Sequence, residues 1–130
     1  MVGATGVPVM TSILTVDDSA SIRQAIKIAL SGEGHSVVEA GNGAEGVAKA
    51  DAGAFSLIIT DLNMPVMDGL TMIRQLRAKP AHAGVPIIFL TTESDADIKA
   101  QAKAAGATGW LTKPFDPEQL VRIVKKVLAS

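Results

Sequence analysis

The sequence contains no cysteine, and this absence excludes disulfide bonds, thiolate metal sites and a thiol nucleophile. No apolar run approaches the roughly 20 residues that a membrane-spanning helix needs. Neither sign of charge is in excess, because the formal net charge is -1, so nothing marks a nucleic-acid or membrane binder. Residues 1–10 lack the basic segment that opens a signal peptide, and we expect residues 1–11 to be a flexible leader. These absences together predict a cytoplasmic protein.

The sequence does contain enough apolar material for a core, since 48% of its 130 residues are hydrophobic. That length fits one domain, which we place at residues 12–130. Five short runs rich in β-branched residues predict strands, at residues 13–16, 36–40, 55–60, 85–90 and 109–112. The third and fourth runs are nearly continuous in apolar residues, which is typical of strands buried on both faces of a parallel sheet.

Helical spacing follows each of these runs. Asn42 with Glu45 three residues later resembles a capping box, and Asp116 before Pro117 predicts another helix start. A further helix is expected to start at position 94 or 95 and to end before Gly106. Three helices carry a core-facing stripe: Ile22, Ala25, Ile26, Ala29 and Leu30; Leu70, Ile73 and Leu76; and Leu120, Ile123, Val124, Val127 and Leu128.

Strand and helix alternate five times, which predicts an α/β fold with a parallel sheet and helices on both faces. In such sheets the functional site lies beyond the carboxyl ends of the strands. Ionisable or hydroxyl side chains follow four of the five predicted strands: Asp17, Asp18, Asp61, Thr91 and Lys113. We therefore expect these side chains to surround one shallow pocket.

Three carboxylates held together repel one another unless positive charge neutralises them. Mg²⁺ or Mn²⁺ suits such a site, because these ions prefer oxygen ligands. His35 and His82 are expected to be exposed in loops far from the strand ends, so zinc is not expected. An aspartate carboxylate can also act as a nucleophile and form an aspartyl-phosphate. Taken alone, Asp17 and Asp18 fit helix capping better than metal binding, and Asp61 fits a turn as well as it fits a nucleophile. Trp110 alone fits a half-buried packing residue.

The set of residues resembles the receiver domain of two-component response regulators, over almost the whole chain. Four separated motifs carry the resemblance in the same order: Asp17-Asp18, the segment 61–69, Thr91, and Lys113-Pro114. Within that family the chain is most similar to CheY-like chemotaxis regulators, which are free-standing receivers. The resemblance implies a doubly wound (βα)5 fold whose five-stranded parallel sheet has the flavodoxin-like order 2-1-3-4-5.

The resemblance also implies how a metal site would be assembled. Asp61 matches the phosphoacceptor, and Asp17 and Asp18 match the acidic pair that holds Mg²⁺. Asn63 matches the position whose backbone carbonyl completes the metal site.

Further positions match the parts of the family's switch. Lys113 matches the lysine that binds the phosphoryl group, and Thr91 matches the switch hydroxyl. Trp110 matches the switch aromatic, which is usually Tyr or Phe. Pro114 implies a cis peptide bond after Lys113.

The implied function is that of a signalling protein and not of an enzyme. A histidine kinase would dock its phosphodonor domain near the first helix and phosphorylate Asp61, and the switch would change binding to a partner, the flagellar motor switch protein in a chemotaxis pathway. We expect a monomer. A phosphate sink that binds no motor stays open as an alternative. An aspartyl-phosphate phosphohydrolase is a third possibility, although such enzymes usually carry an aspartate where this chain has Asn63.

Overall fold

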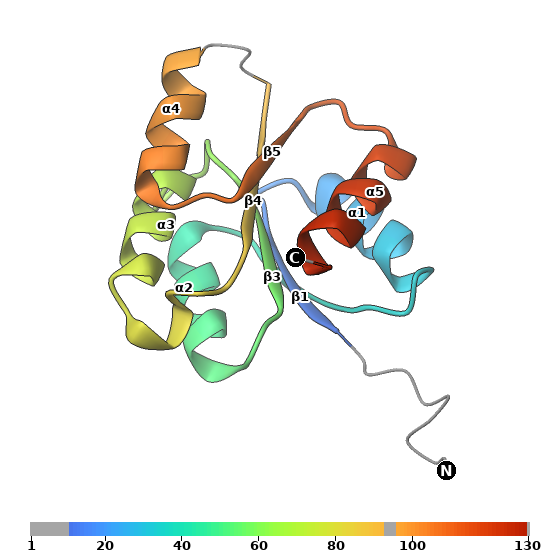
Figure 1. Ribbon diagram of the computed structural model, residues 1–130, viewed down its shortest axis with the longest axis horizontal. Helices are drawn as coiled ribbons and strands as arrows, with labels where there is room; N and C mark the ends of the chain where they lie inside the picture. The colour runs from blue at the N-terminus through green and yellow to red at the C-terminus, as the bar shows by residue number, and fades with distance from the viewer. Residues whose placement is uncertain (1–10, 93–95, 130) are drawn as a thin grey trace.

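The computed structural model describes residues 11–92 and 96–129 (Figure 1). Its five strands are β1 (Ser12–Val16), β2 (Ser36–Ala40), β3 (Leu57–Asp61), β4 (Ile87–Thr91) and β5 (Gly109–Thr112). All neighbouring strands are parallel, and their order is β2-β1-β3-β4-β5. The predicted doubly wound α/β fold and its strand order are confirmed. The expected leader lies outside the described residues except for Thr11, and so does the expected helix start at position 94 or 95.

Helices cover both faces of the sheet. They are α1 (Ala20–Ser31), α2 (Gly43–Ala52), α3 (Gly69–Arg77), α4 (Ala96–Ala105) and α5 (Pro117–Leu128), with a 3₁₀ turn η1 (Pro80–His82). Figure 1 shows α2, α3 and α4 on one side of the sheet and α1 and α5 on the other. None of the helices in the described parts of the chain is long and apolar enough to cross a membrane.

The sheet separates two apolar cores, because successive side chains of a strand point to opposite faces. Leu14 and Phe89 belong to the core under α2, α3 and α4. Ile13 and Ile59 belong to the core under α1 and α5. Burial on both faces explains why β3 and β4 are continuous apolar runs in the sequence.

The helix start signals act as the sequence predicts. The Asn42 side chain accepts a hydrogen bond from the Glu45 N–H at 2.9 Å, and the Glu45 carboxylate accepts one from the N–H of Gly41. The expected capping box is therefore present in a shifted form, because a standard box returns to the N-cap residue itself. Asp116 caps α5 by accepting from the Glu118 N–H at 3.0 Å.

Two strand starts were predicted two residues too early. β4 begins at Ile87, and Pro86 before it has no N–H to donate to the ladder. β3 begins at Leu57; Phe55 packs against the core under α2, α3 and α4 but precedes the strand. β3 and β4 each extend one residue further than predicted, so that Asp61 and Thr91 are themselves the last residues of their strands.

Three predictions of burial are wrong. Ala25 is exposed, because the buried face of α1 is narrow and centres on Ile26 and Leu30. His82 was expected to be exposed and is buried, with its Nε2 atom 2.8 Å from an Asp51 carboxylate oxygen. Pairing with a carboxylate makes the burial of a polar ring tolerable. His35 is half-buried instead of exposed.

Candidate functional site

The carboxyl ends of the strands, which lie towards the top of Figure 1, bring three carboxylates together. Asp17 and Asp18 directly follow β1, and Asp61 ends β3, the strand next to it. One carboxylate oxygen from each of the three residues lies within 4.8 Å of the other two. Asp17 and Asp61 are buried, while Asp18 is exposed. The predicted meeting of the three side chains is confirmed, and their roles stay predictions.

Asp61 is held by its own backbone surroundings. Its Oδ1 atom accepts a hydrogen bond from the Leu62 N–H at 2.8 Å, and its carbonyl accepts one from the Thr60 hydroxyl at 2.8 Å. Burial raises the pKa of the Asp61 carboxyl above its ordinary value, and the nearby Asp17 charge raises it further. Ionisation of Asp61 is therefore unfavourable in the metal-free protein, and added positive charge nearby would make it more favourable.

Lys113 is the cation that faces this cluster. Its Nζ atom lies 3.0 Å from Oδ2 of Asp17 and 3.2 Å from Oδ2 of Asp61. Burial lowers the pKa of Lys113, but the two carboxylates outweigh burial, so the pKa is raised overall and the amine stays protonated. The peptide bond between Lys113 and Pro114 is cis, as the resemblance implies.

Asp17 is fixed at every polar group. Its Oδ1 atom accepts from the Ser19 N–H at 2.9 Å, and its own N–H donates to the Ala40 carbonyl at 3.0 Å. Its carbonyl accepts from the Arg23 guanidinium at 2.6 Å. Ser19 and Arg23 are not among the predicted site residues. Ser19 is a preferred N-cap residue just before α1 and had a readable signal, whereas the contact of Arg23 depends on how α1 approaches the sheet.

The donor set fits a divalent cation. Three carboxylates carry three negative charges, and Lys113 offsets one of them. Hard cations such as Mg²⁺ take carboxylate oxygens and keep several waters, which suits a cluster with one exposed member. The described residues hold no other group of three or more candidate His, Cys, Asp or Glu ligands, and this group contains no histidine, so zinc is not favoured.

The segment after Asp61 returns tightly to the end of β3. The Gly69 N–H donates to the Leu62 carbonyl at 3.0 Å, and a Cβ atom built on Gly69 would lie 2.1 Å from the Asp61 carbonyl oxygen. Only glycine permits this approach. Asp68 caps α3 by accepting from the Thr71 N–H at 2.8 Å, so Asp68 and Gly69 form the turn at which the helix starts.

The loop between these points leaves Asn63 exposed, with Met64 and Met67 packed against the core under α2 and α3. The two methionines therefore serve packing. Val66 has a positive φ of 68° and is 83% exposed. A β-branched residue rarely adopts this left-handed conformation, so its backbone is locally strained.

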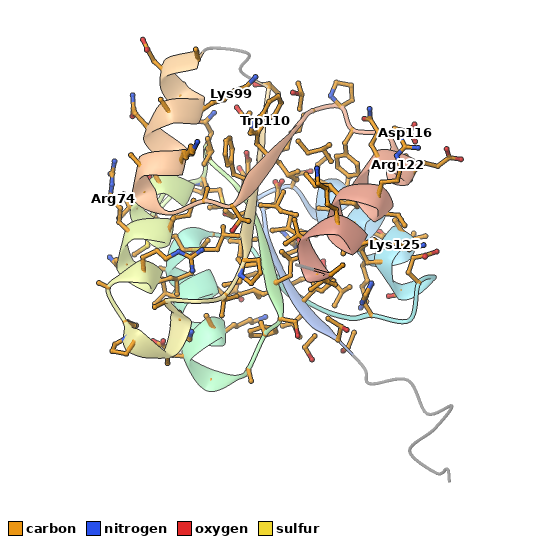
Figure 2. All side chains as sticks on the ribbon, viewed as in Figure 1. Arg74, Lys99, Trp110, Asp116, Arg122 and Lys125 are labelled. Atoms are coloured by element: carbon orange, nitrogen blue, oxygen red, sulfur yellow. The ribbon has the colours of Figure 1, made fainter. Side chains whose placement is uncertain are left out.

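Thr91 and Trp110 lie at different depths on neighbouring strands. Thr91 is buried at the end of β4, whereas Trp110 of β5 is 41% exposed. The Lys99 amine of α4 lies 3.5 Å from the centroid of the Trp110 ring, and Figure 2 shows the two side chains together between α4 and β5. They also line a hollow of about 460 Å³ with Lys103 and Phe89. The ring therefore points outward in this structure, under a cation.

Comparison with known proteins gives one family. The sequence profile described as "Response regulator receiver domain" matches residues 13–125. A curated relative, chemotaxis protein CheY1 of Helicobacter pylori (strain J99 / ATCC 700824), is 39% identical over 120 residues, which are 91% of this chain and 97% of the relative. Transcriptional regulatory protein ResD of Bacillus subtilis (strain 168) is 40% identical over 118 residues, and the match spans only 48% of that longer relative.

Solved structures agree with this result. Chemotaxis response regulator CheY4 of Vibrio cholerae is 44% identical with a TM-score of 0.88, and the match covers 92% of this chain and 99% of that one. The receiver domain of a sensor histidine kinase from Pseudomonas aeruginosa PAO1, described with a magnesium ion coordinated in its active site cleft, is 30% identical with a TM-score of 0.87. That match covers 94% of this chain and all of the other, at 100%.

Proposed function

Because this chain belongs to the response regulator receiver domain family, whose members are signalling proteins and not enzymes, we propose that Asp61 accepts a phosphoryl group from a histidine kinase in a reaction that needs Mg²⁺. The observation that carries the proposal is the contact of Lys113 with both Asp17 and Asp61, beside the group of three carboxylates. The amine and the three carboxylates thus lie within one small volume, which supports a role for Asp61 as nucleophile and for the three carboxylates as oxygen ligands.

The side chains have distinct tasks in this transfer. Asp17, Asp18 and Asp61, with the backbone carbonyl of Asn63, would hold the Mg²⁺, which when bound supplies charge neutralisation at the phosphoryl oxygens. The Leu62 N–H orients the Asp61 carboxylate. The bond from a carboxylate oxygen to phosphorus forms as the bond from phosphorus to the donor's histidine nitrogen breaks, and its electron pair stays on that nitrogen.

Lys113 stabilises the transferred group. Its protonated amine already lies 3.2 Å from Oδ2 of Asp61, so it can pair with a phosphoryl oxygen without a large movement. Thr91 ends the strand next to β3 and can donate its hydroxyl to another oxygen. Movement of Thr91 toward the phosphoryl group would leave space for Trp110, whose position on β5 connects the site to the α4–β5 surface.

The biological setting belongs to the same proposal. Similarity to CheY4 and CheY1 supports chemotaxis signalling in the cytoplasm, with a flagellar motor switch protein as the partner of the phosphorylated form. Capture of that protein by the phosphorylated chain, and not by the unphosphorylated chain, would support the motor role. Phosphorylation without such capture would leave the phosphate-sink role instead.

The direct test is incubation with a small-molecule phosphodonor, followed by intact mass spectrometry. We expect the mass of one added phosphoryl group in the presence of Mg²⁺ and no addition in the presence of a chelator. Proteolytic mapping should place the group on the peptide that contains Asp61. Equal labelling with and without the chelator would contradict the role of the metal ion, and labelling on another peptide would contradict the acceptor.

The Lys99 contact gives a prediction for the switch. Lys99→Met removes the cation from the Trp110 ring, and a cation–π contact at an exposed site is worth about 0.5–1 kcal/mol. The outward population of the ring should then fall roughly two- to fivefold relative to the inward one, by the same energy. Trp110 is the only tryptophan, so acrylamide quenching of intrinsic fluorescence reports it directly and should weaken.

Lys103→Met is the matched control, because Lys103 lines the same hollow and has the same charge without contacting the ring centroid. Its quenching should equal that of the parent. Identical quenching in the parent and both variants would show that Lys99 does not hold the ring.

A further inference from the structure

Arg23 connects three elements at the edge of the candidate site. It projects from α1, its Nη1 atom donates to the Asp17 carbonyl at 2.6 Å, and its Nε atom lies 3.1 Å from Oε1 of Glu39 on β2. We propose that Arg23 is the positioning residue for the metal-binding pair Asp17 and Asp18, with Glu39 as its anchor. The inference rests on the metal site of the proposed function.

The carbonyl that Arg23 holds belongs to the peptide unit that joins Asp17 to Asp18. A peptide unit is planar, so fixing the direction of its carbonyl also fixes the plane from which the next residue departs. The carboxylate of Asp17 is fixed independently, by the Ser19 N–H and by Lys113. Asp18 is exposed. The hydrogen bond from Arg23 therefore sets the angle at which the exposed carboxylate of Asp18 meets the buried one of Asp17.

Glu39 makes this hold rigid. Glu39 pairs in the β1–β2 ladder with Thr15, which is two residues before Asp17. The backbone that carries the Glu39 carboxylate is therefore fixed by the sheet. The side chain of Arg23 is only 21% exposed, and the planar guanidinium reaches both partners at once. The ammonium of a lysine has no such fork and cannot reproduce both contacts in one geometry.

Residues that orient metal ligands from behind typically change metal affinity by about 10- to 100-fold when they are replaced. We expect the dissociation constant for Mn²⁺ to rise about tenfold or more in Arg23→Gln and in Arg23→Lys. Free Mn²⁺ can be measured by electron paramagnetic resonance during a titration, without any phosphorylation. The loss in Arg23→Lys is the decisive result, because that variant keeps the positive charge.

Lys27→Met is the matched control. Lys27 lies one turn further along α1 and also faces Glu39, with its Nζ atom 3.8 Å from Oε2. Lys27→Met removes one positive charge from beside the Glu39 carboxylate and leaves the hydrogen bond to the Asp17 carbonyl intact. We expect its Mn²⁺ affinity to stay within about twofold of the parent, since exposed ion pairs contribute little.

A second readout separates positioning from general damage. In the phosphodonor assay, Arg23→Lys should raise the Mg²⁺ concentration for half-maximal labelling by a similar factor, while the rate at saturating Mg²⁺ stays near that of the parent. Thermal unfolding establishes that each variant is folded. If Arg23→Gln does not fold, Glu39→Gln replaces it, because that change weakens the anchor and should give a smaller loss of Mn²⁺ affinity than Arg23→Lys.

These experiments separate the positioning role of Arg23 from the proposed phosphoryl transfer to Asp61. Parent-like Mn²⁺ affinity in Arg23→Lys would overturn the positioning role, and so would an equal loss in Lys27→Met. Failure of the proposed function looks different: the parent would bind Mn²⁺ in an Arg23-dependent way and still take no phosphoryl group at Asp61.

Discussion

The variant Asp61→Asn is expected to take up no phosphoryl group from a small-molecule phosphodonor in Mg²⁺, under conditions that label the parent fully. Asparagine keeps the size of the side chain and an oxygen that can accept the Leu62 N–H bond, but an amide is not a nucleophile toward phosphorus. It also removes one of the three carboxylates that would hold the metal ion. Both losses act on the same step, so the expected effect is complete loss of labelling, measured by intact mass.

Asp68→Asn provides a matched control for this experiment. Asp68 lies in the same loop, is exposed, and serves as the N-cap of α3, a position where asparagine is as good as aspartate. Its labelling should equal that of the parent. Persistent labelling of Asp61→Asn with an intact control would assign the acceptor to another residue.

Asp61→Asn should also make the metal-free protein more stable to unfolding at neutral pH. The pKa of Asp61 is raised above its ordinary value of 3.8, first by burial and then by Asp17, so the folded parent binds more protons than the unfolded chain. The parent therefore loses stability as the pH rises from 3.8 through the raised pKa, and Asp61→Asn avoids this loss.

Thermal unfolding in a chelator tests this pH dependence. The melting temperature of Asp61→Asn should exceed that of the parent at pH 7, and the difference should vanish below the ordinary carboxyl pKa of 3.8. A parent that is as stable as the variant at neutral pH would mean that the ionised Asp61 carries no strain.

Gly69→Ala is the second change for which we expect a large effect. The added Cβ atom would lie 2.1 Å from the Asp61 carbonyl oxygen and 2.9 Å from Cα of Leu62. Both neighbours are backbone atoms, so the loop or α3 itself must move, and overpacking of this kind costs on the order of 3 kcal/mol. The shift would also displace the Leu62 N–H that orients the Asp61 carboxylate. We therefore expect both a lower free energy of unfolding in urea and slower labelling.

Gly84→Ala separates this effect from the general consequences of replacing a loop glycine. Apart from its two neighbours in the chain, no described residue has an atom within 4 Å of a Cβ built on Gly84, so that variant should match the parent in both measurements. If Gly69→Ala also matched the parent in both measurements, the close approach of Gly69 to the Asp61 carbonyl would be contradicted.

The features that the sequence predicts correctly are local in kind. β-branched runs mark the strands, and parallel pairing then forces their carboxyl ends to one edge, so the meeting of Asp17, Asp18 and Asp61 follows from strand positions alone. Helix caps such as Asn42 and Asp116 are equally local, since each bond spans two or three residues.

Contacts between elements were beyond such patterns. Arg23 contacts Asp17 and Glu39 only because α1 packs beside β2, and no spacing within α1 signals this. His82 is buried because Asp51, 31 residues earlier in the chain, supplies a carboxylate to it. These pairings depend on the assembled fold, whereas an isolated arginine in a sequence is by default an exposed residue and an isolated histidine is intermediate.

Successive side chains of β4 face the two different cores of the domain. Thr91 shares its side of the sheet with Phe89, which belongs to the core under α2, α3 and α4 and is paired in register with Trp110. Ile88 and Leu90 face the other core. In the proposed switch, a displacement of Thr91 would therefore act on the core under α2, α3 and α4 and not on the core under α1 and α5. Recognition of the donor near α1 and binding of the target near α4, both parts of the proposed function, would then be separable by mutation.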